Sequence, residues 1–215
     1  MWHWLRENTD FNIIPYFLWW YPNLSWQLEA LDYFEEWFGQ KIIRLSHPRY
    51  NEILRNQIYQ PPERIGLLNS LELLPFDFAD IEDAIAQWKK LPENVYTAVG
   101  FRGTDNIDRR NLIIQKGAVG SGRRRYWFPI WDWNIKNITD YLKAINVKLP
   151  MDYKYWGRTI GAWDYQLIAP IREHFPEDWE IVKHWTPLIE CEIFRHEVVG
   201  RFANGRLGAL LPDRQ

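Results

Sequence analysis

Short apolar runs alternate along this chain with segments that have helical spacing. Runs that end at glycine, proline or polar residues predict buried strands at residues 12–19, 41–46, 95–99 and 126–130. Apolar positions repeated at helical spacing predict helices at residues 1–8, 25–38, 51–57, 80–91, 137–145 and 178–202. We expect Ser25 to cap its helix, Gly39 to end it, and Thr186-Pro187 to break the last helical stretch.

Strands and helices in this order are typical of parallel βαβ units. We therefore expect an α/β fold in which helices cover both faces of a parallel, Rossmann-like sheet. The 215 residues contain no repeat, low-complexity tract or clear linker, which predicts a single domain. Its sheet core would span residues 1–150 and a mainly helical part residues 151–215, while Pro61–Pro75 is expected to be an insertion loop.

Composition narrows the class of protein. Hydrophobic residues make up 47% of the chain and charged residues 25%, which argues against disorder. The formal net charge of −2 gives no general attraction to nucleic acid or to an anionic membrane. The longest apolar stretch, from Ile13 to Trp20, is too short to span a bilayer, and the single cysteine suits a reducing compartment. We expect a cytoplasmic protein with no membrane partner.

A turn rich in glycine and arginine directly follows the strand expected at residues 95–99. It contains Gly100, Arg102, Asp105, Arg109 and Arg110, and Arg125 lies in a basic run before the next strand. Ligands of open α/β sheets bind at the carboxyl ends of strands, and arginine offers a planar, charged fork for phosphate or sulfate oxygens. The turn therefore predicts an anion site in which Asp105 orients Arg102 or Arg109. The alternative interpretation is a structural ion-pair network, with the basic run as a solvated loop face.

Two further features extend this prediction. Arg158 would close the same anion site from the C-terminal side, or else it stacks on Trp156 or Trp163 as a surface arginine. Trp131 and Trp133 would hold a base by stacking, or else they pack the start of the following helix.

Several of these motifs, in this order, resemble the 3′-phosphoadenylylsulfate (PAPS) reductase family of the adenine-nucleotide α-hydrolase-like group. The resemblance rests on Gly100-x-Arg102-x-x-Asp105-Asn106-x-x-Arg109, the run Phe128 to Trp133, residues Tyr155 to Tyr165, and Phe175-Pro176-Glu177-Asp178-Trp179, with Asn12–Phe17 and His47–Tyr50 upstream. The Phe175–Trp179 pattern is similar to members often encoded by phages. The resemblance covers nearly the whole chain and implies a nucleotide-binding Rossmann-like fold, sulfur metabolism, and PAPS, ATP or adenosine bisphosphate as the nucleotide.

One part of the family pattern has no counterpart in these residues. The family places a Ser-Gly-Gly-x-Asp-Ser type loop after its first strand, and residues 1–8 resemble the later part of the helix that follows it. We therefore expect the first strand and the phosphate loop to be missing. In the family this strand lies between those that match residues 12–19 and 95–99. Either these two pair directly, or a protein partner or second copy completes the sheet, or the chain is a remnant.

The family's reaction also needs a thiol. The reductases use a cysteine in a C-terminal Glu-Cys-Gly-x-His tail, whereas Cys191 is followed by Glu192 in a helical segment, and flanking carboxylates disfavour the reactive thiolate. We expect no catalytic residue and no metal site. The chain is expected to be a PAPS-reductase-like protein, ancestrally reducing sulfonucleotides or catalysing a related adenylating sulfur transfer, but inactive alone. The alternative is a non-catalytic module that binds a nucleotide, a nucleic-acid end or a protein.

Overall fold

The computed structural model describes residues 1–119, 125–157 and 165–203, which fall into two compact units interleaved along the chain. The first unit combines Met1–Pro15 with Phe76–Lys148, and the second combines Tyr16–Pro75 with the described residues from Leu149 onward. Neither unit coincides with residues 1–150 or 151–215. A single folding domain therefore stays a prediction.

The first unit contains a short parallel pair of strands. In it, β3 (Thr97–Ala98) pairs with β4 (Tyr126–Trp127), with Thr97 opposite Tyr126. The helices of this unit are α1 (Trp2–Asn8), α5 (Phe78–Trp88), α6 (Ile107–Lys116) and α7 (Ile135–Ile145). Its buried apolar side chains include Leu5, Ile81, Ile85, Ile113, Phe128 and Ile130.

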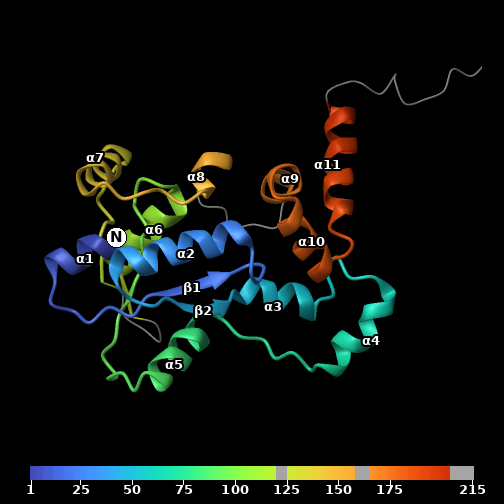
Figure 1. The fold of residues 1–215 in the computed structure, drawn as a ribbon. Helices are drawn as coiled ribbons and strands as arrows, with labels where there is room; N and C mark the ends of the chain where they lie inside the picture. The colour runs from blue at the N-terminus through green and yellow to red at the C-terminus, as the bar shows by residue number, and fades with distance from the viewer. Residues whose placement is uncertain (120–124, 158–164, 204–215) are drawn as a thin grey trace, which may run out of the picture. The chain divides into compact units, whose positions relative to one another are not determined.

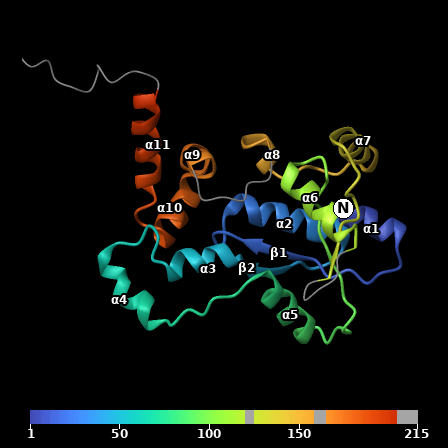
Figure 2. The same cartoon turned by 180° about the vertical axis from the view of Figure 1, so that it is seen from behind.

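The second unit contains the other parallel pair, β1 (Tyr16–Trp19) and β2 (Ile43–Ser46), with Tyr16 opposite Ile43. Its helices are α2 (Ser25–Phe38), α3 (Pro48–Arg55), α4 (Pro62–Ser70), α8 (Asp152–Tyr155), α9 (Tyr165–His174), α10 (Pro176–Trp185) and α11 (Glu190–Ala203). Both views show α2 running along one side of the β1–β2 pair and α9, α10 and α11 grouped together (Figure 1, Figure 2).

A buried carboxylate joins the start of α2 to α10 within this second unit. Asp178 is 1% exposed and accepts hydrogen bonds from the Ser25 backbone N–H at 2.8 Å and from the Ser25 hydroxyl at 2.9 Å. It therefore satisfies an N–H group that the helix leaves unpaired at its N-terminus. The core around this junction includes Tyr21, Leu24, Trp26, Tyr50, Ile168, Ile171, Val182 and Ile189.

The described strands form two separate parallel pairs rather than one sheet. Neither ladder joins β1 to β3, so the direct pairing considered for residues 12–19 and 95–99 is not observed. The described residues thus form a mixed α/β structure, and a Rossmann-like sheet stays a prediction. No helix in the described ranges is long and apolar enough to cross a membrane.

Several local predictions agree with the structure, and others need correction. Helix α2 has the expected bounds and ends at Gly39, whose φ of 63° is the left-handed conformation that favours glycine. Ser25, however, is not the capping residue, because it is the first helical residue and donates to Asp178 instead. The stretch Pro61–Pro75 is not simply a loop, because it contains α4. The sequence patterns also did not predict α6 or α9.

The substitution Asp178→Ala should lower the free energy of unfolding by about 1–3 kcal/mol, because the Ser25 N–H and hydroxyl lose their charged acceptor and a buried side chain is truncated. The matched control is Glu177→Ala, which removes an exposed carboxylate from the same turn of α10 and should change stability by less than about 0.5 kcal/mol. Urea denaturation measures both. Equal midpoints for the two variants would show that Asp178 does not support α2.

Candidate functional site

The arginine turn, residues Gly100–Arg109, begins where β3 ends. The backbone N–H of Val99 donates to the Trp127 carbonyl at 2.8 Å, which extends the parallel pairing one residue beyond β3. The chain then leaves the carboxyl end of the strand at Gly100. A Cβ atom added there would meet only the Met1 Sδ, at 3.7 Å, so packing does not require glycine at this position.

Asp105 brings the two leading arginines of the turn together. Its Oδ1 accepts from Arg102 Nε at 2.8 Å and also from Arg102 Nη2, and its Oδ2 accepts from Arg109 Nη1 at 2.7 Å. The Arg102 backbone N–H donates to the same Oδ2 at 3.1 Å. The expected pairing of Asp105 with Arg102 or Arg109 is therefore observed with both. This arrangement is also the ion-pair network of the alternative interpretation.

Local chain geometry explains why Arg109 reaches Asp105. The side chain of Asn106 accepts from the Arg109 backbone N–H at 2.8 Å and caps α6. This cap places Arg109 in the first turn of α6, four residues after Asp105, at the spacing that allows side chains to meet. The Arg109 guanidinium also lies 4.4 Å from the centroid of the Phe101 ring, which stacks on buried Phe128.

The charges of this network do not balance. Burial tends to raise the pKa of Asp105, but hydrogen bonds from Arg102 and Arg109 hold it below the ordinary value. One carboxylate thus faces two guanidinium groups, which leaves one net positive charge. Arg102 Nη1 is buried and has no hydrogen-bond partner. The turn therefore offers an unsatisfied cationic N–H donor beside an ordered carboxylate.

The other predicted site residues differ in their placement. Arg110 and Arg125 are exposed, and Arg158 lies outside the described residues. Trp131 is 44% exposed, whereas Trp133 packs edge-on against Trp4 and Tyr141 just before α7 begins. The packing at Trp133 is that of the alternative interpretation, in which this tryptophan supports a helix start.

A link between the arginine turn and the tryptophan segment was not visible in the sequence. The Gly103 N–H donates to the Trp131 carbonyl at 2.8 Å, and the Thr104 hydroxyl donates to the Trp133 carbonyl at 3.0 Å. These bonds fix the backbone of the exposed Trp131 beside the turn. Thr104 is therefore a site residue that sequence reasoning missed, because its partner lies 29 positions away.

Cys191 belongs to the second unit and has no base paired with it in the described contacts. It is exposed in the first turn of α11, between Glu190 and Glu192. The buried Glu192 carboxylate accepts a hydrogen bond from Arg195 Nε at 2.8 Å. Hydrogen bonding to Arg195 keeps the pKa of Glu192 below its usual range. No group of three or more histidine, cysteine, aspartate or glutamate side chains suited to a metal ion occurs among the described residues.

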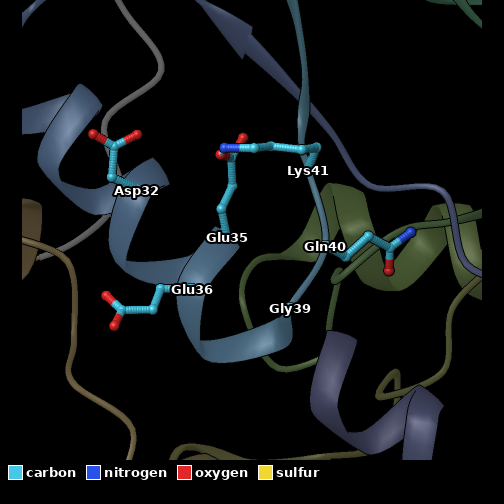
Figure 3. Close-up of a pocket in the computed structure, with 6 residues that line it drawn as sticks. All are labelled: Asp32, Glu35, Glu36, Gly39, Gln40 and Lys41. Atoms are coloured by element: carbon cyan, nitrogen blue, oxygen red, sulfur yellow. Dashed lines mark hydrogen bonds and ion pairs between the residues drawn. The ribbon is translucent and has the colours of Figure 1, made fainter.

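A shallow cavity of about 290 Å³ lies at the C-terminal end of α2 in the second unit. Figure 3 shows the Lys41 side chain reaching Glu35 while Gln40 points away from it. Glu35 accepts from Lys41 Nζ at 2.5 Å and from the Ile42 N–H at 3.0 Å, and these bonds lower its pKa. These contacts of Glu35 join the end of α2 to the segment that leads into β2.

No protein-family model, no curated protein and no solved structure matches this chain. The resemblance to PAPS reductases therefore rests on the motifs in the sequence and stays a prediction.

The substitution Asp105→Asn should destabilise the protein by about 1–3 kcal/mol at pH 7, because two guanidinium groups lose their charged acceptor. The pKa of Asp105 is lowered in the folded state, so its contribution is fully present above the unfolded value of about 3.9 and is lost as the pH falls further. The difference in urea midpoint between wild type and Asp105→Asn should therefore shrink below about pH 4. Asp108→Asn, at an exposed position in α6, is the control. A pH-independent difference would contradict this assignment.

Proposed function

We propose that this chain is a PAPS-reductase-like protein that binds the phosphate or sulfate group of an adenine nucleotide at the arginine turn, without reducing it. The observation that carries the proposal is the buried Nη1 of Arg102, which has no partner although Asp105 orders the rest of its guanidinium group. An anion oxygen would accept from this N–H, and its charge would offset the excess positive charge of Arg102 and Arg109.

The surroundings of the turn support a nucleotide rather than an inorganic ion alone. Asp105 holds the Arg102 fork before any ligand arrives, so little side-chain freedom remains to be lost on binding. Trp131 is 44% exposed, and its carbonyl is bonded to the Gly103 N–H, so an exposed tryptophan is attached to the turn by its backbone. An adenine ring could stack there, as the resemblance to a nucleotide-binding family implies.

We propose binding without reduction because the chain departs from the cysteine-containing tail that the reductases use. Cys191 is its one cysteine, and it is followed by Glu192 within α11, where the reductases have the glycine of a Glu-Cys-Gly-x-His tail.

A second candidate function is a non-catalytic protein-interaction module. The observation that favours it is a pair of exposed apolar side chains on α6, Ile107 and Ile114, which are 69% and 70% exposed. Residues seven positions apart lie on the same face of a helix, so the two form one apolar strip next to the arginine turn.

Adenosine 3′,5′-bisphosphate should raise the Tm of the wild-type chain. At ten times its Kd, a ligand that binds only the folded state adds about 1.4 kcal/mol, or roughly 3–6 °C in Tm for a chain of this size. Arg102→Lys should remove most of this shift, because lysine keeps the charge but lacks the planar fork that both Asp105 and the anion need. Differential scanning fluorimetry measures the shift, with sodium sulfate as the simpler probe.

The matched control for this test is Arg49→Lys, which changes an exposed arginine of the second unit that pairs with Glu52. This variant should keep the full ligand shift. The proposal is wrong if millimolar nucleotide leaves the wild-type Tm unchanged, or if Arg102→Lys and Arg49→Lys respond alike.

The 215-residue chain should release no sulfite from PAPS when thioredoxin and its reductase supply electrons, because its one cysteine does not belong to a Glu-Cys-Gly-x-His tail like that of the reductases. Sulfite release is measured colorimetrically against a chain-free blank. If sulfite is released by the wild type and not by Cys191→Ser, the chain is a reductase and the proposal of binding alone is overturned.

A further inference from the structure

Strand β3 of the first unit pairs with β4 along one of its two edges. The backbone N–H groups of Thr97 and Val99 donate to carbonyls of the segment that contains β4, each at 2.8 Å. Backbone polar groups of successive residues in a strand point to alternate edges, so those of Tyr96 and Ala98 face the other edge. In the described part of the chain, neither of these two N–H groups donates a hydrogen bond, and no strand besides β4 pairs with β3. We call this row of backbone groups the open edge of β3.

The open edge lacks the residue types that usually protect an edge strand from pairing. Natural edge strands often carry a lysine or a proline for this purpose. Residues 95–99 read Val-Tyr-Thr-Ala-Val instead, without a charge or a proline. Val95 is 37% exposed, Tyr96 is 48% exposed, and the three residues that follow are partly exposed. An uncharged apolar edge of this kind favours the addition of a further strand.

The open edge is complementary to a second copy of itself in an antiparallel register centred on Thr97. In this register Tyr96 of one copy lies opposite Ala98 of the other, and each such pair exchanges two backbone hydrogen bonds, because both residues face the shared edge. The large tyrosine side chain then lies beside the small alanine. On the opposite face Val95 lies opposite Val99, and the two Thr97 side chains lie opposite each other. Cross-strand pairs of β-branched residues stabilise a sheet.

Symmetry and charge favour a second copy as the partner of this edge. An antiparallel pair of identical strands has a two-fold axis, so the contact closes at two copies. The edge is uncharged, so two copies meet without repulsion between like charges, whereas a charged peptide would find no complementary charge on it. Pairing would also replace a ladder of two short strands by a sheet of four strands, which is the more stable arrangement.

We propose that two copies of this chain associate through the open edge of β3, in the antiparallel register centred on Thr97. The strands of the resulting sheet follow the order β4–β3–β3–β4. The contact uses backbone groups that the fold leaves unpaired and apolar side chains that it leaves exposed. No arginine takes part in it, so the association does not depend on the anion site proposed at the arginine turn.

Sedimentation equilibrium of the full chain tests the association. At about 100 µM the wild type should have twice the mass of one chain and should dissociate on dilution. The substitution Ala98→Pro should raise the Kd of the dimer at least about tenfold, because it removes one N–H donor from each copy. The Ala98 N–H donates no hydrogen bond within the described part of the chain, so proline removes none from the single copy.

A second variant keeps the proposal testable if the Ala98→Pro chain does not fold. Tyr96→Lys places a charged side chain on the open edge and should also give the mass of one chain. Its matched control is Tyr153→Lys, because Tyr153 is 45% exposed, close to the exposed fraction of Tyr96, and belongs to the second unit. The control should associate as the wild type does. Circular dichroism and urea midpoints establish that each variant is folded.

Cross-linking tests the register of the two strands. The two Thr97 residues would form a pair without mutual hydrogen bonds, in which the Cα atoms lie about 4.5 Å apart, and a disulfide can span this distance. The test uses a Cys191→Ser background, which removes the one cysteine of the chain. In this background Thr97→Cys should give a covalent dimer on a non-reducing gel after mild oxidation. Thr139→Cys, at an exposed position in α7, should give the single chain.

The proposal is overturned if the wild type has the mass of one chain at about 100 µM, which would mean that water or a different protein covers the open edge. It is also overturned if a folded Ala98→Pro or Tyr96→Lys variant dimerises as tightly as the wild type. Equal cross-linking of Thr97→Cys and Thr139→Cys would show that the two β3 strands do not meet at Thr97 and would likewise overturn it.

Discussion

This structure depends on one kind of interaction, in which a carboxylate accepts hydrogen bonds from both a backbone N–H and a side-chain donor. Asp178 binds the Ser25 N–H and hydroxyl and joins α10 to the start of α2. Asp105 binds the Arg102 N–H and two guanidinium groups, and Glu35 binds the Ile42 N–H and Lys41. Charge-assisted hydrogen bonds are stronger than neutral ones, so a single carboxylate can hold a helix end or a turn where a short strand pair cannot.

The two parallel strand pairs show why these carboxylates matter. Parallel strands usually occur in larger sheets that helices cover on both faces, and a pair of short strands has few backbone hydrogen bonds of its own. The described ladders are four residues long in β1–β2 and two residues long in β3–β4. The segments at the strand ends are therefore held mainly by side chains, and the arginine turn after β3 is one of them.

Asp152 and Arg102 contrast with the satisfied carboxylates. Each has a buried polar atom without a partner, and the two have opposite charge. Arg102 belongs to a turn with excess positive charge, whereas burial raises the pKa of the Asp152 carboxyl to about 6. Each of these two charged side chains thus keeps one buried unpaired atom, and such a group costs about 1–3 kcal/mol.

The sequence by itself determined the features that depend on neighbours along the chain. The bounds of α2 follow from apolar spacing and Gly39, and the Asp105 network joins residues three and four positions apart. Predicted strands at residues 12–19 and 95–99 are also present in shorter form, as β1 and β3. Such contacts close small loops, so a local pattern is sufficient to predict them.

Only the tertiary structure decided which distant residues meet. Asp178 reaches Ser25 across 153 positions, the Thr104 hydroxyl reaches Trp133 across 29, and Trp26 packs on Trp156. The pairing of β1 with β2 and of β3 with β4, in place of one sheet, likewise joins segments that are separated in the sequence. These contacts depend on competition among many partners of similar hydrophobicity and charge, and no spacing along the chain specifies which partner is selected.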